Sequence, residues 1–183
     1  KMHLTKQNCD MIYEAGILHD IGKIVIPDSI LLKPSRLNDN EYKLIKKHSS
    51  IGFELLSKVN DFKKIANIIH FHHERVDGLG YPKGLKSDEI PLESKILAIA
   101  DGFDTMTTNR IYNKRKSLEE ALEELNDYKN SMYDSDIVDI AIEVLSKEKI
   151  EEDISQNPIS QMESARFSYF YNDQLTHLYN INY

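Results

Sequence analysis

The chain has 183 residues, 40% of them apolar, and a formal net charge of −7. That size fits one domain of medium length with a buried core. The negative charge argues against a general DNA- or RNA-binding protein, because such binding depends largely on cations that neutralise phosphates. A single cysteine excludes an internal disulfide framework. No apolar run approaches the ~20 residues needed to cross a bilayer, so we expect a cytoplasmic protein without membrane contact.

Helical periodicity dominates the chain and predicts an all-α bundle. Apolar stripes predict helices over residues 5–20, 38–58, 62–74, 92–108, 117–130 and 134–147. Asn38, Ser117 and Asp134 are typical N-cap residues, and Glu41 completes a capping box with Asn38. These signals place most of the chain in amphipathic helices.

The longest predicted loop covers residues 75–91 and holds three of the seven glycines. Loops of this length in compact domains are usually functional. Further along, residues 151–159 are polar and acidic and are predicted to form a linker, which makes 1–150 the main domain. Residues 160–183 are predicted to form an additional helix.

Six ionisable residues lie close to apolar neighbours on predicted helices or at helix ends: His19, Asp20, His48, His72, His73 and Asp101. Ionisable groups directed into a core cost several kcal/mol unless they are paired or bind a metal. Imidazoles and carboxylates together are ligands for Fe, Mn, Zn or Ni. Adjacent helical residues point about 100° apart, so each doublet can serve two neighbouring ions. The pattern predicts a binuclear metal centre, although each histidine taken alone is more often a core or surface residue.

The other three histidines do not fit this pattern. His70 precedes the second doublet by two residues and should face elsewhere, whereas His3 and His177 are expected on the surface.

Four motifs follow one another along the chain. They are His-Asp-Ile-Gly-Lys at 19–23, His-His-Glu-Arg at 72–75, Asp-Gly-Leu-Gly-Tyr-Pro at 77–82 and Asp-Gly-Phe-Asp at 101–104. With further matches at 26–28, 33–34, 48, 90–92 and 110–112, this string resembles the HD-GYP family over residues 12–145. The ordered string is far more specific than an isolated His-Asp pair.

The resemblance implies an HD-domain helical bundle with a long, glycine-rich loop. It implies hydrolysis of cyclic di-GMP to pGpG, GMP or both, at a site with two or three divalent ions, usually iron or manganese. It also implies that the six residues above are the metal ligands, with Asp20 bridging two ions.

For catalysis and substrate binding, the resemblance implies that a metal-activated hydroxide attacks the phosphate, with Asp20 and Lys23 as catalytic residues. Lys23 would contact the phosphate; the alternative is a solvated lysine favoured by the helix dipole. Gly80, Tyr81 and Pro82 would border the substrate cleft, Tyr81 either contacting substrate or packing the loop.

The resemblance also implies that Arg110 contacts the nucleotide. The family commonly has a basic residue after the tyrosine at position 112, where this chain has Asn113. We therefore expect that contact to shift, with Lys114 as the candidate.

A second resemblance lies at residues 173–180, where Asp-Gln-Leu-Thr-His-Leu-Tyr-Asn is similar to the opening of GGDEF domains. It implies a signalling helix and the start of a GGDEF-type domain at 160–183; a homodimer is also expected. The family's helix upstream of the His-Asp pair, with further His or Glu ligands, is expected to precede residue 1. Two alternatives therefore stay open: a catalytically weak module that binds cyclic dinucleotides, and an HD-type phosphohydrolase of another nucleotide.

Overall fold

The computed structural model describes residues 2–33, 35–108 and 116–147, and within these ranges every regular element is helical. Seven elements precede the long loop: α1 (Lys6–Leu18), the short 3-10 helix η1 (Ile21–Val25), α2 (Asp28–Leu31), α3 (Asp39–Ile45), α4 (His48–Leu56), η2 (Asn60–Phe62) and α5 (Lys63–His70). The loop itself contains η3 (Ser87–Glu89), and three helices follow it: α6 (Leu92–Thr107), α7 (Leu118–Asp127) and α8 (Ser135–Leu145). The predicted all-α class is confirmed.

Several predictions fall outside the described residues. They are the linker at 151–159, the segment at 160–183, His177, Arg110 and Lys114. Within the described ranges, no helix is both long and apolar enough to cross a membrane.

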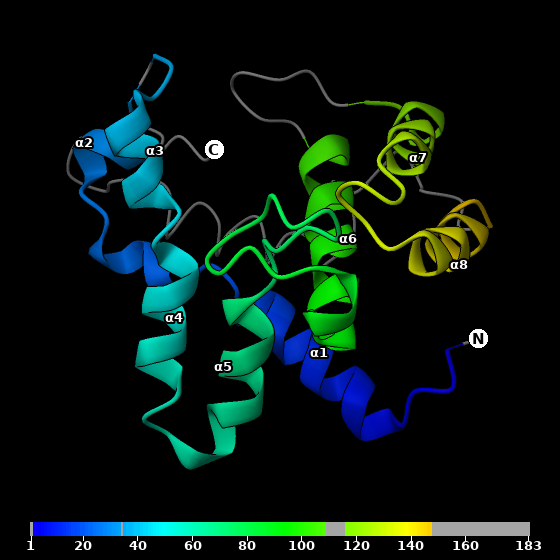
Figure 1. Cartoon of the computed structure of the whole chain (residues 1–183), viewed down its shortest axis with the longest axis horizontal. Coiled ribbons are helices and arrows are strands. Elements are labelled where there is room, and N and C mark those ends of the chain that lie inside the picture. The colour runs from blue at the N-terminus through cyan, green and yellow to red at the C-terminus, as the bar shows by residue number, and fades with distance from the viewer. Residues whose placement is uncertain (1, 34, 109–115, 148–183) are drawn as a thin grey trace, which may run out of the picture.

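Helix α6 is shared by two packed groups of helices. Figure 1 shows α4 and α5 as neighbouring helices joined through η2, with α1 and α6 beside α5 and with α7 and α8 beyond α6. Leu97 of α6 belongs to a core cluster with Ala15, Ile65, Ile68 and Ile69. Two residues later, Ile99 belongs to a second cluster with Leu125, Tyr133, Ile137 and Val138.

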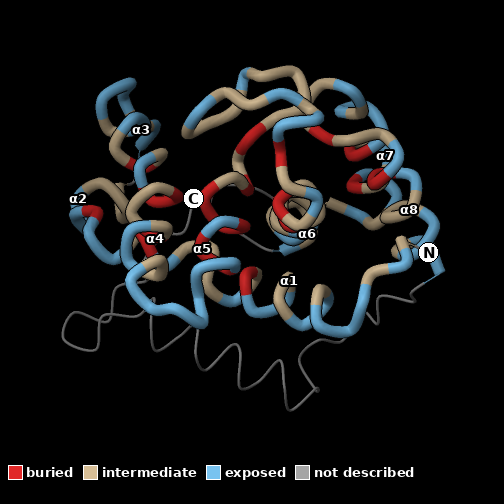
Figure 2. The backbone as a smooth tube through the Cα atoms, turned by 60° about the horizontal axis from the view of Figure 1, so that its bottom comes forward, coloured by how far each residue is buried: buried red, intermediate tan, exposed pale blue. Residues whose placement is uncertain are grey.

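Burial is concentrated where these helices meet. Figure 2 shows buried segments on α4, α5 and α6, whereas Ala15 is the only buried residue of α1. Because α6 contributes to both clusters, it fixes the α1–α5 group against α7 and α8.

The prediction of one continuous helix over 38–58 is wrong. The segment forms two helices, α3 and α4, separated by Lys46 and Lys47. The amide of Lys47 donates to the carbonyl of Leu44, a tighter turn than an α-helix makes. The sequence has no glycine or proline there, so packing of His48, Ser49 and Gly52 in the interior decides the break.

Four other helices, α1, α5, α7 and α8, end two to four residues earlier than predicted. Helix α1 stops at Leu18 and α5 stops at His70, so both doublets lie in turns directly after a helix rather than on it. The predicted N-caps are confirmed: the side chains of Asn38, Ser117 and Asp134 each accept a backbone amide of the first turn.

Candidate metal centre

Four separate stretches of chain bring the six candidate ligands together. His19 and Asp20 come from the turn after α1, His48 from the first residue of α4, His72 and His73 from the turn after α5, and Asp101 from α6. His19 Nε2 lies 3.4 Å from Asp20 Oδ2 and 3.6 Å from Asp101 Oδ1. The other oxygen of Asp20, Oδ1, lies 3.6 Å from His48 Nε2. Asp20 therefore lies between two histidines, with one oxygen toward each.

Three of these histidines form a compact cluster. His48, His72 and His73 each offer a ligand atom, and these atoms all lie within 4.8 Å of one another. The ring centroids of His72 and His73 are 3.9 Å apart, and those of His48 and His73 are 5.0 Å apart. A single ion can reach all three nitrogens.

The ends of three helices orient these rings. The Nδ1 atoms of His19, His48 and His72 lie 2.7, 2.8 and 2.6 Å from the carbonyl oxygens of Gly16, Ile45 and Ile69. Each carbonyl belongs to the last turn of α1, α3 or α5 and lacks an intrahelical partner there. In His48 and His72, an Nδ1–H that donates to such a carbonyl leaves Nε2 unprotonated and able to bind a metal. His19 also donates through Nε2 to Asp20, and it would have to lose that proton to bind a metal.

Among the described residues, three buried side-chain nitrogens have no hydrogen bond: His70 Nδ1, outside the cluster, and two within it. His48 Nε2 and His72 Nε2 are buried without a hydrogen bond, and both side chains are almost fully buried. Leaving a buried polar atom unsatisfied costs about 1–3 kcal/mol. The orphaned nitrogens, together with nearby carboxylates and no thiolate, fit a divalent metal ion.

The charges in the cluster follow from burial and pairing. Burial lowers the pKa of His19, but the hydrogen bond and charge of Asp20 and the charge of Asp101 outweigh it and raise that pKa to about 9. Burial and the neighbouring His19 lower the pKa of His72 to about 3. Burial also lowers the pKa of His48 and of His73. These three imidazoles are therefore neutral at pH 7, the form that binds metals.

The carboxylate of Asp20 is held ionised. Burial raises its pKa, but the hydrogen bond from His19 and the charge of Lys23 outweigh it and bring the pKa far below the ordinary value. Lys23 Nζ donates to Asp20 Oδ2 at 2.7 Å. Lys23, predicted to contact phosphate, is thus paired with a predicted ligand.

Residue 22 requires glycine. A Cβ atom there would lie 1.9 Å from the carbonyl oxygen of His48 and 2.7 Å from the amide nitrogen of Gly52. The turn that carries Asp20 can therefore approach the start of α4, which carries His48.

The glycine-rich loop at 75–91, which we call the GYP loop, borders the cluster. The amide of Tyr81 donates to the carbonyl of His73 at 3.1 Å, and the two rings lie 4.8 Å apart. A Cβ atom at Gly80 would lie 2.5 Å from the Cα of Glu74, so only glycine allows this approach. The peptide bond from Tyr81 to Pro82 is cis.

Glu74 is the residue whose role the sequence did not reveal. It is buried, and its carboxylate accepts the amides of Lys83, Gly84 and Leu85 at 2.6, 3.1 and 2.9 Å. One carboxylate thus anchors the second half of the GYP loop beside the histidine doublet. The sequence offered one indication of this role: Glu74 is an acidic residue directly between the His72-His73 doublet and the GYP loop.

The remaining described histidines lie outside the cluster. The ring of His70 packs against Phe53 and Phe71, with centroids 4.6 Å from each, and His3 is exposed. His70 therefore faces away from the cluster and His3 lies on the surface, as predicted.

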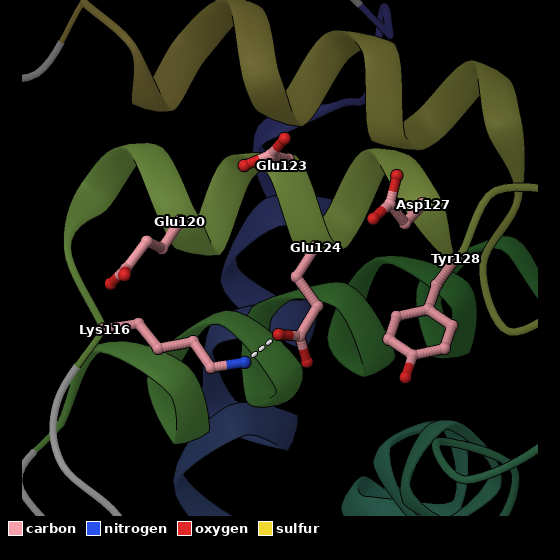
Figure 3. Close-up of a pocket in the computed structure, with 6 residues that line it drawn as sticks. All are labelled: Lys116, Glu120, Glu123, Glu124, Asp127 and Tyr128. Atoms are coloured by element: carbon pink, nitrogen blue, oxygen red, sulfur yellow. Dashed lines mark hydrogen bonds and ion pairs between the residues drawn. The ribbon is translucent and has the colours of Figure 1, made fainter.

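A separate hollow lies along α7 (Figure 3). Its lining is mostly acidic and includes Glu120, Glu123 and Asp127, with one ion pair between Lys116 and Glu124. None of the six candidate ligands lines it. Because phosphates are anionic, this acidic hollow is a poor site for a nucleotide.

Comparisons with known proteins show the family of the chain. The chain matches the family described as HD domain over residues 1–137. A cyclic di-GMP phosphodiesterase of Thermotoga maritima is 44% identical over 152 residues, which cover 78% of this chain and 41% of that protein. The cyclic di-GMP phosphodiesterase response regulator RpfG of Xanthomonas campestris is 42% identical, over 76% of this chain and 37% of the relative.

Related proteins also include enzymes named for another cyclic dinucleotide. The 3'3'-cGAMP-specific phosphodiesterase 2 of Vibrio cholerae is 39% identical, over 76% of this chain and 27% of the relative. A crystal structure of a cyclic GMP-AMP specific phosphodiesterase of V. cholerae superposes with a TM-score of 0.66 at 21% identity, covering 88% of this chain and 44% of that one. That likeness supports the HD-domain fold. The chain spans less than half the length of these relatives.

Proposed function

Because this chain belongs to the HD domain family, we propose that it is a metal-dependent phosphodiesterase that hydrolyses cyclic di-GMP to pGpG, GMP or both. The observation that carries the proposal is the meeting of four imidazoles and two carboxylates beside the GYP loop. Similarity to cyclic di-GMP phosphodiesterases over three quarters of the chain supports the substrate. The Gly-Tyr-Pro motif supports membership of the HD-GYP branch.

We propose the six candidate ligands as the protein's metal ligands, for two divalent ions. The two oxygens of Asp20 face different histidines, which supports a bridging role. Imidazole and carboxylate ligands without thiolates suit iron or manganese. Bound there, such ions would supply a nucleophile at neutral pH and neutralise charge on the phosphate.

The protein's own residues would orient the reaction. Lys23 fixes Asp20 through their hydrogen bond and adds positive charge next to the site where phosphate would lie. Burial raises the pKa of Tyr81 far above its ordinary range, so the phenol stays protonated and can donate a hydrogen bond to substrate. Glu74 holds the loop that carries Tyr81. Gly80 and Pro82 complete the proposed cleft border.

Other sequence predictions stand as proposals. We propose Arg110 and Lys114 as nucleotide contacts. A homodimer and a GGDEF-type domain at 160–183 remain predictions of the sequence, to be tested by molar mass in solution and by assaying a longer polypeptide.

Hydrolysis of 3'3'-cGAMP is the second candidate, because relatives named for that substrate are up to 41% identical. Incubating anaerobically reconstituted protein with a panel of nucleotides separates the two. We expect cyclic di-GMP to disappear and pGpG or GMP to accumulate. Preferential loss of 3'3'-cGAMP would select the second candidate, and binding of cyclic di-GMP without product would select a regulatory module.

A further inference from the structure

Lys46 lies between α3 and α4, two residues before His48, with its ammonium group over two tyrosine rings. Its Nζ lies 4.6 Å from the ring centroid of Tyr42 and 5.4 Å from that of Tyr81. Tyr42 is one helical turn before Lys46, whereas Tyr81 comes from the GYP loop. The contact with Tyr81 therefore depends on the tertiary structure and positions Lys46 beside the metal cluster.

No carboxylate of the described residues neutralises the charge of Lys46. Among the described residues Lys46 forms no ion pair, whereas Lys23 is bound to Asp20 and Lys33 to Glu41. Aromatic faces attract a cation and orient it without cancelling its charge. Lys46 is thus a half-buried cation near the site, available to an anion.

The chain of ring contacts links this cation to the candidate ligands. Tyr81, which faces Lys46, lies 4.8 Å from the ring of His73 and 6.4 Å from that of His48. An anion on Lys46 would therefore sit on the Tyr81 side of the metal cluster, one aromatic ring away from it. That position suits a second negative group of the same substrate.

Cyclic di-GMP carries two phosphodiesters in one ring, and only one can occupy the metal ions at a time. We propose that Lys46, held over Tyr42 and Tyr81, binds the second phosphodiester, the one that is not being cleaved. This inference rests on the proposed function. It makes Lys46 a specificity-determining residue, because a phosphodiester with one phosphate has nothing to place there.

The test compares Lys46→Gln with Lys47→Gln, which removes the same charge from the adjacent, exposed position. Each reconstituted protein is assayed with cyclic di-GMP and with bis(p-nitrophenyl) phosphate, which has a single phosphodiester. We expect Lys46→Gln to raise KM for cyclic di-GMP at least about tenfold, the scale of one lost charge-assisted hydrogen bond. The kinetics with bis(p-nitrophenyl) phosphate should stay within about twofold of wild type.

The outcomes separate the two claims. Equal KM values for Lys46→Gln and Lys47→Gln, or a similar loss on both substrates, would overturn the role of Lys46. If wild-type protein cleaves neither substrate, the proposed function fails. The role of Lys46 is then tested by measuring the affinity of wild type and both variants for cyclic di-GMP by titration calorimetry. In that case weaker binding by Lys46→Gln alone supports the assignment, and equal or absent binding in all three proteins overturns it.

Discussion

A histidine binds a metal ion through a nitrogen that carries no proton, and in this protein the ends of three helices determine which nitrogen of each ring faces the cluster. His19, His48 and His72 each place Nδ1 against a carbonyl three residues earlier, in the last turn of a helix. Those carbonyls need donors because the helix supplies none. One interaction therefore completes a helix end and directs Nε2 of each ring toward the cluster.

At the same scale, Glu74 connects the cluster to the GYP loop. Replacing Glu74 with Gln removes the charge that three amides share, and it places an NH2 group where only donors lie. We expect a loss of about 1–3 kcal/mol in the free energy of unfolding, with a higher KM for cyclic di-GMP. Urea unfolding followed by circular dichroism measures the first, and steady-state kinetics the second.

Glu89→Gln is the matched control, because Glu89 is exposed and its carboxylate accepts one amide, that of Lys86. It should change the free energy of unfolding much less. If Glu74→Gln and Glu89→Gln lower the free energy of unfolding by the same amount, Glu74 does not anchor the loop.

At the scale of elements, the approach of η1 to α4 depends on Gly22. Gly22→Ala would place Cβ against the backbone of His48 and Gly52, which cannot rotate away. We expect η1 to move off α4, at a cost of about 1–3 kcal/mol or more in unfolding free energy, with weaker metal binding. Thermal unfolding and metal titration check the two effects.

Gly16→Ala supplies the contrast within α1. There the nearest atom to a new Cβ is Leu97 Cδ1 at 3.8 Å, an ordinary contact. Alanine in a helix interior should stabilise by about 0.5–1 kcal/mol. Destabilisation of similar size by both substitutions would show that crowding at residue 22 is not the cause.

Asp134 joins α8 to α6. It caps α8 through the amide of Asp136, and it accepts a hydrogen bond from Lys95 Nζ at 2.9 Å. Burial raises its pKa, but Lys95 and the backbone amides outweigh it, so the folded pKa lies below the ordinary value. The ion pair therefore stabilises the fold at neutral pH, and that contribution is lost as pH falls through the lowered pKa.

Asp134→Asn keeps a good N-cap and removes the charge. At pH 7 we expect it to lower the free energy of unfolding by about 1 kcal/mol. The difference from wild type should shrink below about pH 4, as the wild-type carboxyl is protonated. Urea unfolding at a series of pH values measures it; a difference that stays constant down to pH 2 would rule out the ion pair as its source.

Helix starts were predictable because their signals are local. The capping box of Asn38 and Glu41 spans four residues and forms as the sequence indicates. The break at Lys46 and Lys47 was not predictable, because lysine favours helices and the cause is packing of α4 against α5 and η1. The early ends of α1 and α5 were not predictable for the same reason. They involve contacts of the His19 and His72 rings with carbonyls of the last helical turn, inside the folded cluster.

At the scale of the whole molecule, residue type and order predicted which six side chains gather, because their chemistry does not suit a helical core without a partner. Their mutual distances required the fold. Glu74 and Lys46 escaped prediction for a related reason: Glu74 binds amides nine to eleven residues away, and Lys46 meets a tyrosine on a different segment. No local pattern encodes such contacts.

The cluster also lies where the two packed groups of helices are joined. Asp101 is on α6, the helix that contributes to both core clusters, while His19, whose Nε2 lies 3.6 Å from Asp101 Oδ1, follows α1. Ions bound there would tie α6 to α1, α4 and α5.

Metal content per chain tests the central claim most directly. Wild type, Asp20→Ala and the exposed control Asp10→Ala are reconstituted anaerobically with iron or manganese, dialysed, and analysed for metal and for cyclic di-GMP hydrolysis. We predict about two ions per chain and turnover in wild type and the control, as in two-metal phosphodiester hydrolysis. Asp20→Ala should lose most of the metal and all turnover. Wild-type metal content and activity in Asp20→Ala would contradict the account.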